Sequence, residues 1–358
     1  MLNSRERFHA TVHYAARDRP YHWDWMGPEY EATIARWLQE GMPPDTHWRN
    51  YGQYDRTEYV PLNAWLCPRY QIQVLEVTES YEVYRDSDGV IKRKLRDGPL
   101  PAMPQFVDYP LKERDDWPAI KTRLHPDSPA RFPPYWNSMR HGYEDRDYVL
   151  CIRVGSLFGW LRNLMGLEAL CLALYDDRPF IERVVTEITD FSLAYLDLAL
   201  EGVAYDFASF CEDMAHKTGP MIDPVLYRKL WGPHYRRLVD RIHRAGIETI
   251  FLDSDGNLEE LIPIWLDLGI NFIYPLEVAA GMDVVKLRKM FGRDLIMGGG
   301  VDKRVLAGDR MGIRRMVERV APLVQEGGYI PCPDHCIPPD VPWENFVYYE
   351  QLMSAIES

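Results

Sequence analysis

Short apolar runs alternate with amphipathic segments from residue 148 onward. The runs occupy residues 148–155, 202–210, 247–253, 270–277, 293–300 and 327–334. Each run is short enough to be a buried strand. Helix-like stretches lie between them at 179–199, 224–245, 258–268 and 283–291, and Gly246, Gly269 and Gly292 follow three of these, where a helix C-terminus favours glycine. The repeated order of strand, helix, glycine and strand predicts parallel βαβ units.

An earlier apolar run, PYHWDWM at residues 20–26, supplies one more strand. Seven of the eight strands of a (β/α)8 barrel are then visible. The alternative is a doubly wound open sheet, but no Gly-x-Gly-x-x-Gly motif opens a helix after the first strand. We therefore expect one α/β domain over residues 1–358, a (β/α)8 barrel of the TIM type.

The first 145 residues are rich in Trp, Tyr and Pro and show little helical periodicity, which is typical of an insertion-rich region. Within this region, residues 71–95 alternate apolar and polar positions on both sides of Asp86-Ser87-Asp88-Gly89. This pattern predicts an antiparallel β-hairpin inserted within the barrel domain.

Composition narrows the class of protein. The chain has 358 residues with 41 Lys and Arg against 54 Asp and Glu, and the net charge of −13 argues against nucleic acid as a partner. No apolar run reaches the ~18–20 residues that cross a bilayer, and the N-terminal segment is charged throughout, unlike a signal peptide. We expect a cytoplasmic protein without membrane contact, whose six cysteines are reduced thiols or metal ligands.

In a barrel of this type, chemistry belongs at the carboxyl ends of the strands. Here those ends carry a series of acidic residues: Asp24, Glu212 with Asp213, Asp253 with Asp255, Glu277, Asp302, and Asp334 with His335. So much negative charge in one buried region requires a cationic group to balance it.

Asp253 and Asp255 directly follow one predicted strand, in the sequence Asp253-Ser254-Asp255-Gly256-Asn257. Alternation along the chain turns both carboxylates toward one pole, as a divalent metal requires. The same residue types also suit a turn and a helix N-cap. The two roles are compatible.

Cys332-Pro333-Asp334-His335-Cys336 places two thiols and an imidazole within five residues. The spacing resembles half of a zinc site, but the chain has no second Cys pair of that spacing. In the alternative interpretation, both cysteines are small buried apolar residues and His335 is a hydrogen-bonded core residue. His335 is the strongest candidate, because a neutral imidazole ligates metals and moves protons near pH 7.

Six longer blocks of sequence follow one another in an order that is typical of a known family. They read RERFHATVHYAARDRP, GSLFGWLRNLMGLEALCLALYDD, FCEDMAHKTGPMIDP, DSDGNLEELIPIWLDLGINFIYPLEVAAGMD, LIMGGGVDKRVLA and GGYIPCPDHCIPPDVPWENF. Together they resemble the uroporphyrinogen decarboxylase superfamily, which also contains the corrinoid-linked methyltransferases of methanogens and acetogens. The resemblance extends essentially from end to end. It implies a (β/α)8 barrel with its cleft at the carboxyl ends of the strands, and a homodimer.

The superfamily that this chain resembles contains enzymes with different functions. Decarboxylases of the superfamily carry an Arg-rich segment after the first strand, whose guanidinium groups bind the many carboxylates of the substrate. This chain reads DWMGPEYEATIAR there, with Met26, Gly27, Pro28 and Glu29 in place of the arginines. A polyanionic tetrapyrrole is therefore poorly matched to this site.

The zinc methyltransferases of the superfamily carry His-x-Cys at the end of the fourth predicted strand, which is the run at 247–253 when the run at 20–26 is counted first. They carry a further Cys near the last strand. The matching positions here are Asp253-Ser254-Asp255-Gly256 and His335, with Cys332 as the alternative third ligand. Oxygen and imidazole thus replace thiolates. Such ligands leave a bound zinc or other divalent ion harder and more Lewis acidic.

From this resemblance we expect an enzyme that moves a methyl group from a small methoxylated substrate to a corrinoid. Asp253, Asp255 and His335 are then metal ligands, and Glu212 or Glu277 completes the shell or acts as a general acid or base. The chain has no corrinoid-binding Asp-x-His-x-x-Gly pattern, so a partner protein supplies the corrinoid.

Two other functions remain open. In a decarboxylase without cofactor, Asp253 or Asp24 stabilises a developing cation, while Arg153 or Arg162 holds the substrate carboxylate. Both arginines also suit ion pairs with the acidic residues of the cleft. The aromatic residues of the first 145 positions, Trp25 among them, are candidates to stack on a substrate. The third function is a protein that binds a methylated or corrinoid ligand without turnover.

Overall fold

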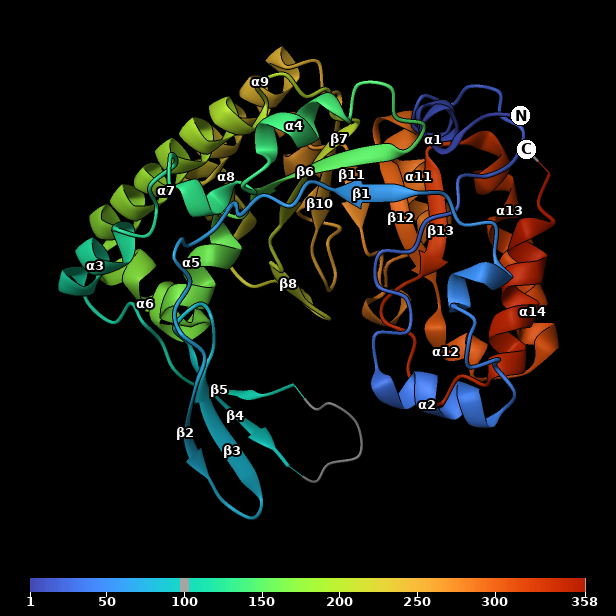
Figure 1. Ribbon diagram of the computed structural model, residues 1–358, viewed down its shortest axis with the longest axis horizontal. Helices are drawn as coiled ribbons and strands as arrows, with labels where there is room; N and C mark the ends of the chain where they lie inside the picture. Colours follow the sequence, from blue (N-terminus) through green and yellow to red (C-terminus); the bar gives the residue numbers. More distant parts are fainter. Residues whose placement is uncertain (97–102, 358) are drawn as a thin grey trace.

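The computed structural model describes residues 1–96 and 103–357, and a curled sheet of parallel strands forms its centre (Figure 1). Its strand order is β1-β6-β7-β10-β11-β12-β13, and each neighbouring pair is parallel. The bounds are β1 (Thr57–Tyr59), β6 (Val149–Gly155), β7 (Phe207–Cys211), β10 (Thr249–Asp253), β11 (Phe272–Tyr274), β12 (Ile296–Val301) and β13 (Tyr329–Pro333). The architecture is α/β, of the TIM-barrel type.

Helices cover the outside of the curled sheet (Figure 1). Those that follow its strands are α5 (Phe158–Met165), α6 (Leu167–Asp176), α7 (Arg178–Ala199), α8 (Pro224–Leu230), α9 (Gly232–Arg244), α10 (Ile262–Leu268), α11 (Val284–Phe291), α12 (Lys303–Leu306), α13 (Arg310–Glu326) and α14 (Trp343–Ser354). Four more lie earlier in the chain: α1 (Ser4–Val12), α2 (Glu31–Gln39), α3 (Trp117–Lys121) and α4 (Trp136–His141). The helix expected at 224–245 is divided at Trp231, because Pro233 cannot donate a backbone N–H to a continuous helix.

The expected strand at 20–26 is the main correction to the predicted barrel. Within the described residues it pairs with no strand, and the parallel sheet has seven strands rather than eight. Tyr21 and Trp23 nevertheless pack in the apolar interior of the sheet. The segment leaves extended geometry at Asp24, whose Oδ1 accepts the backbone N–H groups of Met26 and Gly27 and so forms a turn.

A second, antiparallel sheet projects from the barrel (Figure 1). It contains β2 (Gln73–Val77), β3 (Tyr81–Arg85), β4 (Ile91–Leu95) and β5 (Gln105–Asp108), in that order. Residues 71–95 thus form three antiparallel strands, one more than a hairpin. The turn expected at 86–89 joins β3 to β4, and Asp86 Oδ1 accepts the N–H groups of Asp88 and Val90.

Buried aromatic side chains fill the interior of the curled sheet. Phe207, Phe251 and Phe272 come from the successive strands β7, β10 and β11. Because side chains two positions apart share a face of a strand, the inward positions nearest the carboxyl ends are Cys211, Asp253 and Tyr274. The core therefore changes from apolar to polar toward that end of the barrel.

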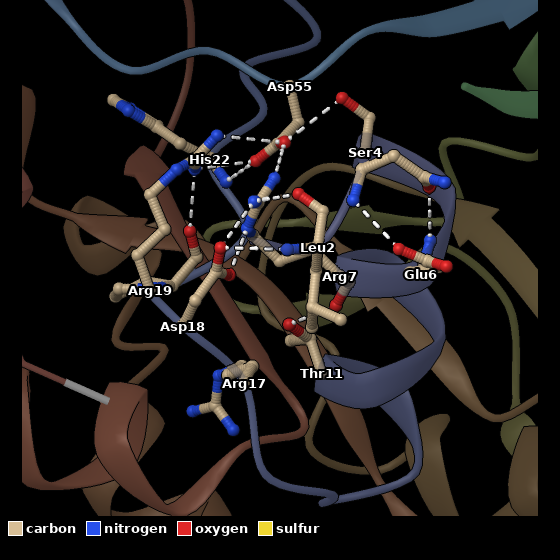
Figure 2. A network of polar contacts seen from close by, with 12 residues as sticks. Leu2, Ser4, Glu6, Arg7, Thr11, Arg17, Asp18, Arg19, His22 and Asp55 are labelled. Carbon is tan, nitrogen blue, oxygen red and sulfur yellow. Dashed lines mark hydrogen bonds and ion pairs between the residues drawn. The ribbon is translucent and has the colours of Figure 1, made fainter. Parts of the chain in front are cut away.

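A buried ion-pair network holds the N-terminal segment against the start of β1 (Figure 2). The Asp55 carboxylate is buried and accepts from Ser4 Oγ, from the guanidinium groups of Arg7 and Arg19, and from the backbone N–H of His22. This network places residues 20–24, and with them Asp24 and Trp25. In residues 1–96 and 103–357, none of the helices has the length and apolar character needed to cross a membrane.

Candidate functional site

Three potential metal ligands meet at the carboxyl end of the barrel. Asp255 lies two residues after β10, Glu277 three residues after β11, and His335 two residues after β13. One ligand atom from each lies within 4.8 Å of the other two. We call Asp255, Glu277 and His335 the acidic–imidazole cluster.

Backbone amides fix the loops that carry this cluster. The N–H of Gly256 donates to Glu277 Oε2 at 2.8 Å, which joins the loop after β10 to the loop after β11. Asp334 accepts the N–H of Val278 at 2.8 Å on Oδ2 and the N–H of Lys303 at 3.1 Å on Oδ1. The strand ends of β10, β11, β12 and β13 are therefore held together just below the cluster.

His335 faces Asp255 across the cluster, with 3.6 Å between Nε2 and Asp255 Oδ2. The Asp255 carboxylate, together with the Cys336 side chain, raises the pKa of the imidazole to about 10. The backbone N–H of Cys336 also lies 2.8 Å from Nδ1, which makes Nδ1 the acceptor nitrogen of the neutral ring. A proton on Nε2 therefore points at Asp255, and a metal ion at Nε2 would have to displace it.

Asp253 lies below the cluster and is only 7% exposed. Burial, followed by the charges of Asp213 and Asp255, raises the pKa of its carboxyl to about 8. Its Oδ2 accepts from Cys211 Sγ at 3.3 Å, whereas its Oδ1 is buried without a hydrogen-bond partner among the described residues.

The structure does not place Asp253, an expected ligand, or Cys332, the alternative third ligand, among the converging ligand atoms. Asp253 is the last residue of β10, so its side chain points into the barrel rather than out to the loops. Cys332 lies on β13 in the apolar interior, where burial holds its thiol pKa far above the ordinary range. Glu277 occupies the third position instead.

Glu212 is fully buried and faces the start of α5. Its carboxylate accepts from Ser156 Oγ at 2.8 Å, from the N–H groups of Leu157 and Gly159 at 2.8 and 2.9 Å, and from the Tyr235 hydroxyl. These contacts make Glu212 the partner of a helix N-terminus. The structure does not bring Glu212 to the acidic–imidazole cluster.

Asp24 is also buried away from the cluster. It is 1% exposed, and burial raises its pKa to about 6. The next residue, Trp25, stacks on Phe251 with ring centroids 5.1 Å apart and an interplanar angle of 9°. The Trp25 ring also meets Tyr59 edge to face at 5.0 Å. Trp25 therefore stacks on the inward residue that precedes Asp253 along β10.

The two candidate arginines differ in their partners. Arg162 donates from Nη1 to the backbone oxygen of Asp213 at 2.6 Å, and its Nη2 lies 3.4 Å from Asp213 Oδ2, so it is an ion-pair residue. Arg153 lies over the Tyr59 ring, 4.6 Å from its centroid. In the described part of the chain, no carboxylate forms an ion pair with Arg153.

Three residues of this region were not predicted from the sequence. Tyr59 lies on β1, which has only three residues and too little apolar content to be recognised as a strand. Tyr274 is an inward position of the expected strand at 270–277, so alternation along that run was a usable signal for it. Cys211, which contacts Asp253, was identifiable by the same alternation along β7.

The donor set of the cluster fits a divalent ion. Two carboxylates and one imidazole are ligands that zinc and comparable ions accept. Asp255 Oδ1 is buried and lacks a hydrogen-bond partner among the described residues, which a bound cation would provide. The chemistry of the residues and their convergence therefore agree.

Comparison with known proteins places the fold. A family model described as uroporphyrinogen decarboxylase (URO-D) matches residues 99–356. A solved methyltransferase from Methanosarcina mazei is similar over 99% of this chain and 98% of its own, with a TM-score of 0.59 and 12% identity. A B12-independent methionine synthase from a Shewanella species matches over 78% and 74%, at a TM-score of only 0.35 and 8% identity. No curated protein is similar enough in sequence to count as a relative.

The family match covers β6 to β13 and all three residues of the acidic–imidazole cluster. The likeness to the Methanosarcina structure extends over nearly the whole chain and shows the same fold. These matches agree with the parallel curled sheet and with polar residues at its carboxyl end. The chain belongs to the uroporphyrinogen decarboxylase family.

Proposed function

We propose that this chain is a metal-assisted methyltransferase that takes a methyl group from a small methoxylated substrate and transfers it to a corrinoid carried by a partner protein. The observation that supports this is the convergence of Asp255, Glu277 and His335 within 4.8 Å. A group of two carboxylates and one imidazole at the carboxyl end of the barrel lies where enzymes of this architecture act.

The three residues of the acidic–imidazole cluster would hold zinc or another divalent ion. When bound, the ion supplies Lewis acidity to the heteroatom that carries the methyl group. Gly256 keeps the Glu277 carboxylate in position through its backbone N–H. The Trp25 ring and the Arg153 guanidinium, both close to Tyr59, orient the substrate below the cluster.

The methyl acceptor is proposed to arrive on a separate protein. This chain lacks the Asp-x-His-x-x-Gly pattern that binds a corrinoid. A carrier that docks at the carboxyl end of the barrel would present the acceptor to the same residues that hold the substrate. The partner is therefore a requirement of the proposed reaction and is tested with it.

Elemental analysis of protein purified without chelator or affinity metal tests the metal assignment. About one equivalent of a divalent ion is expected in the wild type and none in His335→Ala. The control is His216→Ala, because His216 is an exposed histidine of the same end of the barrel that lies outside the cluster. Methyl transfer is then followed by the visible spectrum of an added corrinoid protein with methoxylated substrates. Full activity in a metal-free His335→Ala would overturn the proposal.

A decarboxylase is the second candidate, and one observation favours it. Arg153 is available to a substrate carboxylate, and the buried carboxyl of Asp253, with its pKa raised to about 8, holds a proton at neutral pH. After loss of carbon dioxide, Asp253 would return that proton to the substrate carbon. Release of carbon dioxide by chelator-treated protein, lost in Arg153→Gln, would establish this reaction. Ligand binding without any product would instead indicate a binding protein.

A further inference from the structure

An arginine and a carboxyl group, neither of them in an ion pair within the described residues, lie on neighbouring parts of the barrel interior. Arg153 is on β6 and Asp253 is the last residue of β10, with β7 between the two strands. Arg153 pairs with Ser209 and Ser209 with Phe251, so Asp253 lies two strands across and two residues further along. At about 4.8 Å between strands and about 3.3 Å per residue, the two backbones are about 12 Å apart. They form no ion pair with each other, although both face the same end of the barrel.

The Asp253 carboxylate lacks a partner that its burial calls for. It is 7% exposed, and Oδ1 has no hydrogen-bond partner within residues 1–96 and 103–357. Buried polar atoms in folded proteins are nearly always hydrogen-bonded, so an orphaned carboxylate oxygen indicates a missing donor. Asp253 lies outside the acidic–imidazole cluster, so its Oδ1 is not one of the ligand atoms that converge there.

The Arg153 guanidinium is held in place without being neutralised. It lies over the face of the Tyr59 ring at 4.6 Å, a contact that fixes the planar group and leaves its N–H donors free to bind. Its residue is exposed, although it continues the inward-facing series that begins with Val149 and Cys151. The charge is therefore accessible from the carboxyl end of the barrel.

The Tyr59 hydroxyl is close enough to Arg153 and to Asp253 for both groups to influence its pKa. Burial raises the pKa of its hydroxyl, and among the nearby charges Arg153 lowers it while Asp253 raises it, so both act on the same group. The Trp25 ring packs edge to face on Tyr59 and stacks on Phe251, two residues before Asp253. Tyr59 and Trp25 thus form an aromatic wall that extends from Arg153 to Phe251 on the strand of Asp253.

We propose that Arg153 and Asp253 bind the two ends of a zwitterionic ligand of the amino-acid type. Its carboxylate forms the bidentate pair with Arg153. Its ammonium donates to Asp253 Oδ1 and lies against the aromatic wall, and the carboxyl proton of Asp253 is released to solvent when the ammonium binds. A ligand with one charge leaves the other protein charge unpaired. A zwitterion satisfies both.

This inference names a substrate class for the proposed methyl transfer and rests on that function for the reactive end of the molecule. The substrate is then an amino acid whose side chain ends in the methylated heteroatom. That end extends toward Asp255, two residues beyond Asp253 and part of the acidic–imidazole cluster.

Calorimetric binding to the full-length protein as purified tests the substrate class without any turnover. The probes are O-methyl-homoserine, which carries both charges, 3-methoxypropylamine, which lacks the carboxylate, and 4-methoxybutanoate, which lacks the ammonium. The series one methylene shorter, built on O-methyl-serine, covers the other chain length. At least one zwitterion is expected to bind at least about 10-fold more tightly than both of its singly charged analogues. Equal affinities within both series, or no binding at all, would overturn the proposal.

Two variants assign the charges. Arg153→Gln should lower the affinity for the zwitterion to that of the amine, and Asp253→Asn should lower it to that of the acid. The matched controls are Arg319→Gln and Asp283→Asn, which remove the two halves of an exposed ion pair 2.6 Å long and should keep the preference. Loss of the preference in the controls, or its survival in both site variants, contradicts the assignment.

The outcomes separate this inference from the proposed function. A preference for zwitterions in a protein that transfers no methyl group supports the binding site and overturns the reaction. Metal-dependent demethylation without that preference overturns only the substrate class. The readout of the binding series is affinity, which does not depend on the corrinoid partner.

Discussion

Gly256 donates its backbone N–H to Glu277 Oε2 at 2.8 Å, so one loop residue fixes a member of the acidic–imidazole cluster on the next loop. Gly256 adopts φ +89°, and a Cβ at this position would lie 2.5 Å from the backbone oxygen of Ala215. Both the left-handed conformation and the lack of space require glycine here. The position of Glu277 therefore depends on a residue without a side chain.

Gly256→Ala is expected to reduce both the free energy of unfolding and the metal content. Gly246→Ala is the control, because Gly246 has a similar φ of +82° but no atom within 4 Å of the added methyl group. Backbone strain alone costs about 1 kcal/mol at Gly246, and the collision with Ala215 adds about 1–3 kcal/mol at Gly256. Urea denaturation and elemental analysis measure the two effects. Equal stability of the two variants would show that the loop absorbs the collision.

Glu212→Gln is expected to destabilise the fold without removing the metal. Four donors point at this fully buried carboxylate, and an amide turns one of its own N–H groups toward them. The expected loss is about 3 kcal/mol in the free energy of unfolding. The surface carboxylate Glu259, paired with Lys286, offers a control whose Gln variant should change stability by less than about 1 kcal/mol. A stable Glu212→Gln protein without metal would show a role in the site instead.

Glu350→Gln is expected to change how stability depends on pH. Burial raises the pKa of Glu350 from 4.5 to about 8, and Tyr54 donates to its Oε1 at 2.7 Å. Because the folded state binds this proton more tightly, its stabilising contribution is complete below about pH 4.5 and is lost as the pH rises through about 8. The variant should lack this part of the decline.

Urea denaturation of wild type and Glu350→Gln at several pH values between about 5 and 9 measures this difference. The limiting slope for one proton is about 1.4 kcal/mol per pH unit. Glu344→Gln is the control, since Glu344 forms an exposed pair with Arg310. Parallel curves for wild type and Glu350→Gln would mean that Glu350 is ionised in the folded protein at neutral pH.

Asp55→Asn is expected to be among the most destabilising changes outside the barrel interior. The Asp55 carboxylate binds Arg7 and Arg19 and the backbone N–H of His22 (Figure 2). Removing its charge leaves Arg7, which is 4% exposed at its side chain, without one of its two acidic partners. We expect a loss of about 3–5 kcal/mol in denaturant unfolding. A loss no larger than that of Glu58→Gln, a variant of an exposed pair, would contradict the importance of this network.

The strands recognisable from sequence were those with enough consecutive apolar residues. The six runs from residue 148 onward all became strands of the parallel sheet. Thr57–Tyr59 was missed, because three residues carry too little pattern and its pairing with β6 exists only in the folded chain. Residues 20–26 have the apolar content of a strand, but the turn at Asp24 and the Asp55 network determine their path instead.

Some residues of the candidate site could likewise be predicted from the sequence, and others could not. Asp255 and His335 were identifiable because they follow predicted strands of a barrel, where parallel carboxyl ends meet. Membership of the cluster was decided by the path of each loop, which excluded Asp253 and Cys332 and included Glu277. Glu212 has the same residue type and a similar position as Glu277, but it turns toward the start of α5.

The class of fold, the end of the barrel that carries the chemistry and the excess of acidic groups there could all be predicted from the chain alone. These follow from periodicity and composition, which are local properties of the chain. The folded chain was needed to see which carboxylates converge, and that Arg153 lies over the Tyr59 ring while Asp253 Oδ1 has no partner among the described residues. Such relationships join strands separated by about a hundred residues, and packing rather than local pattern sets them.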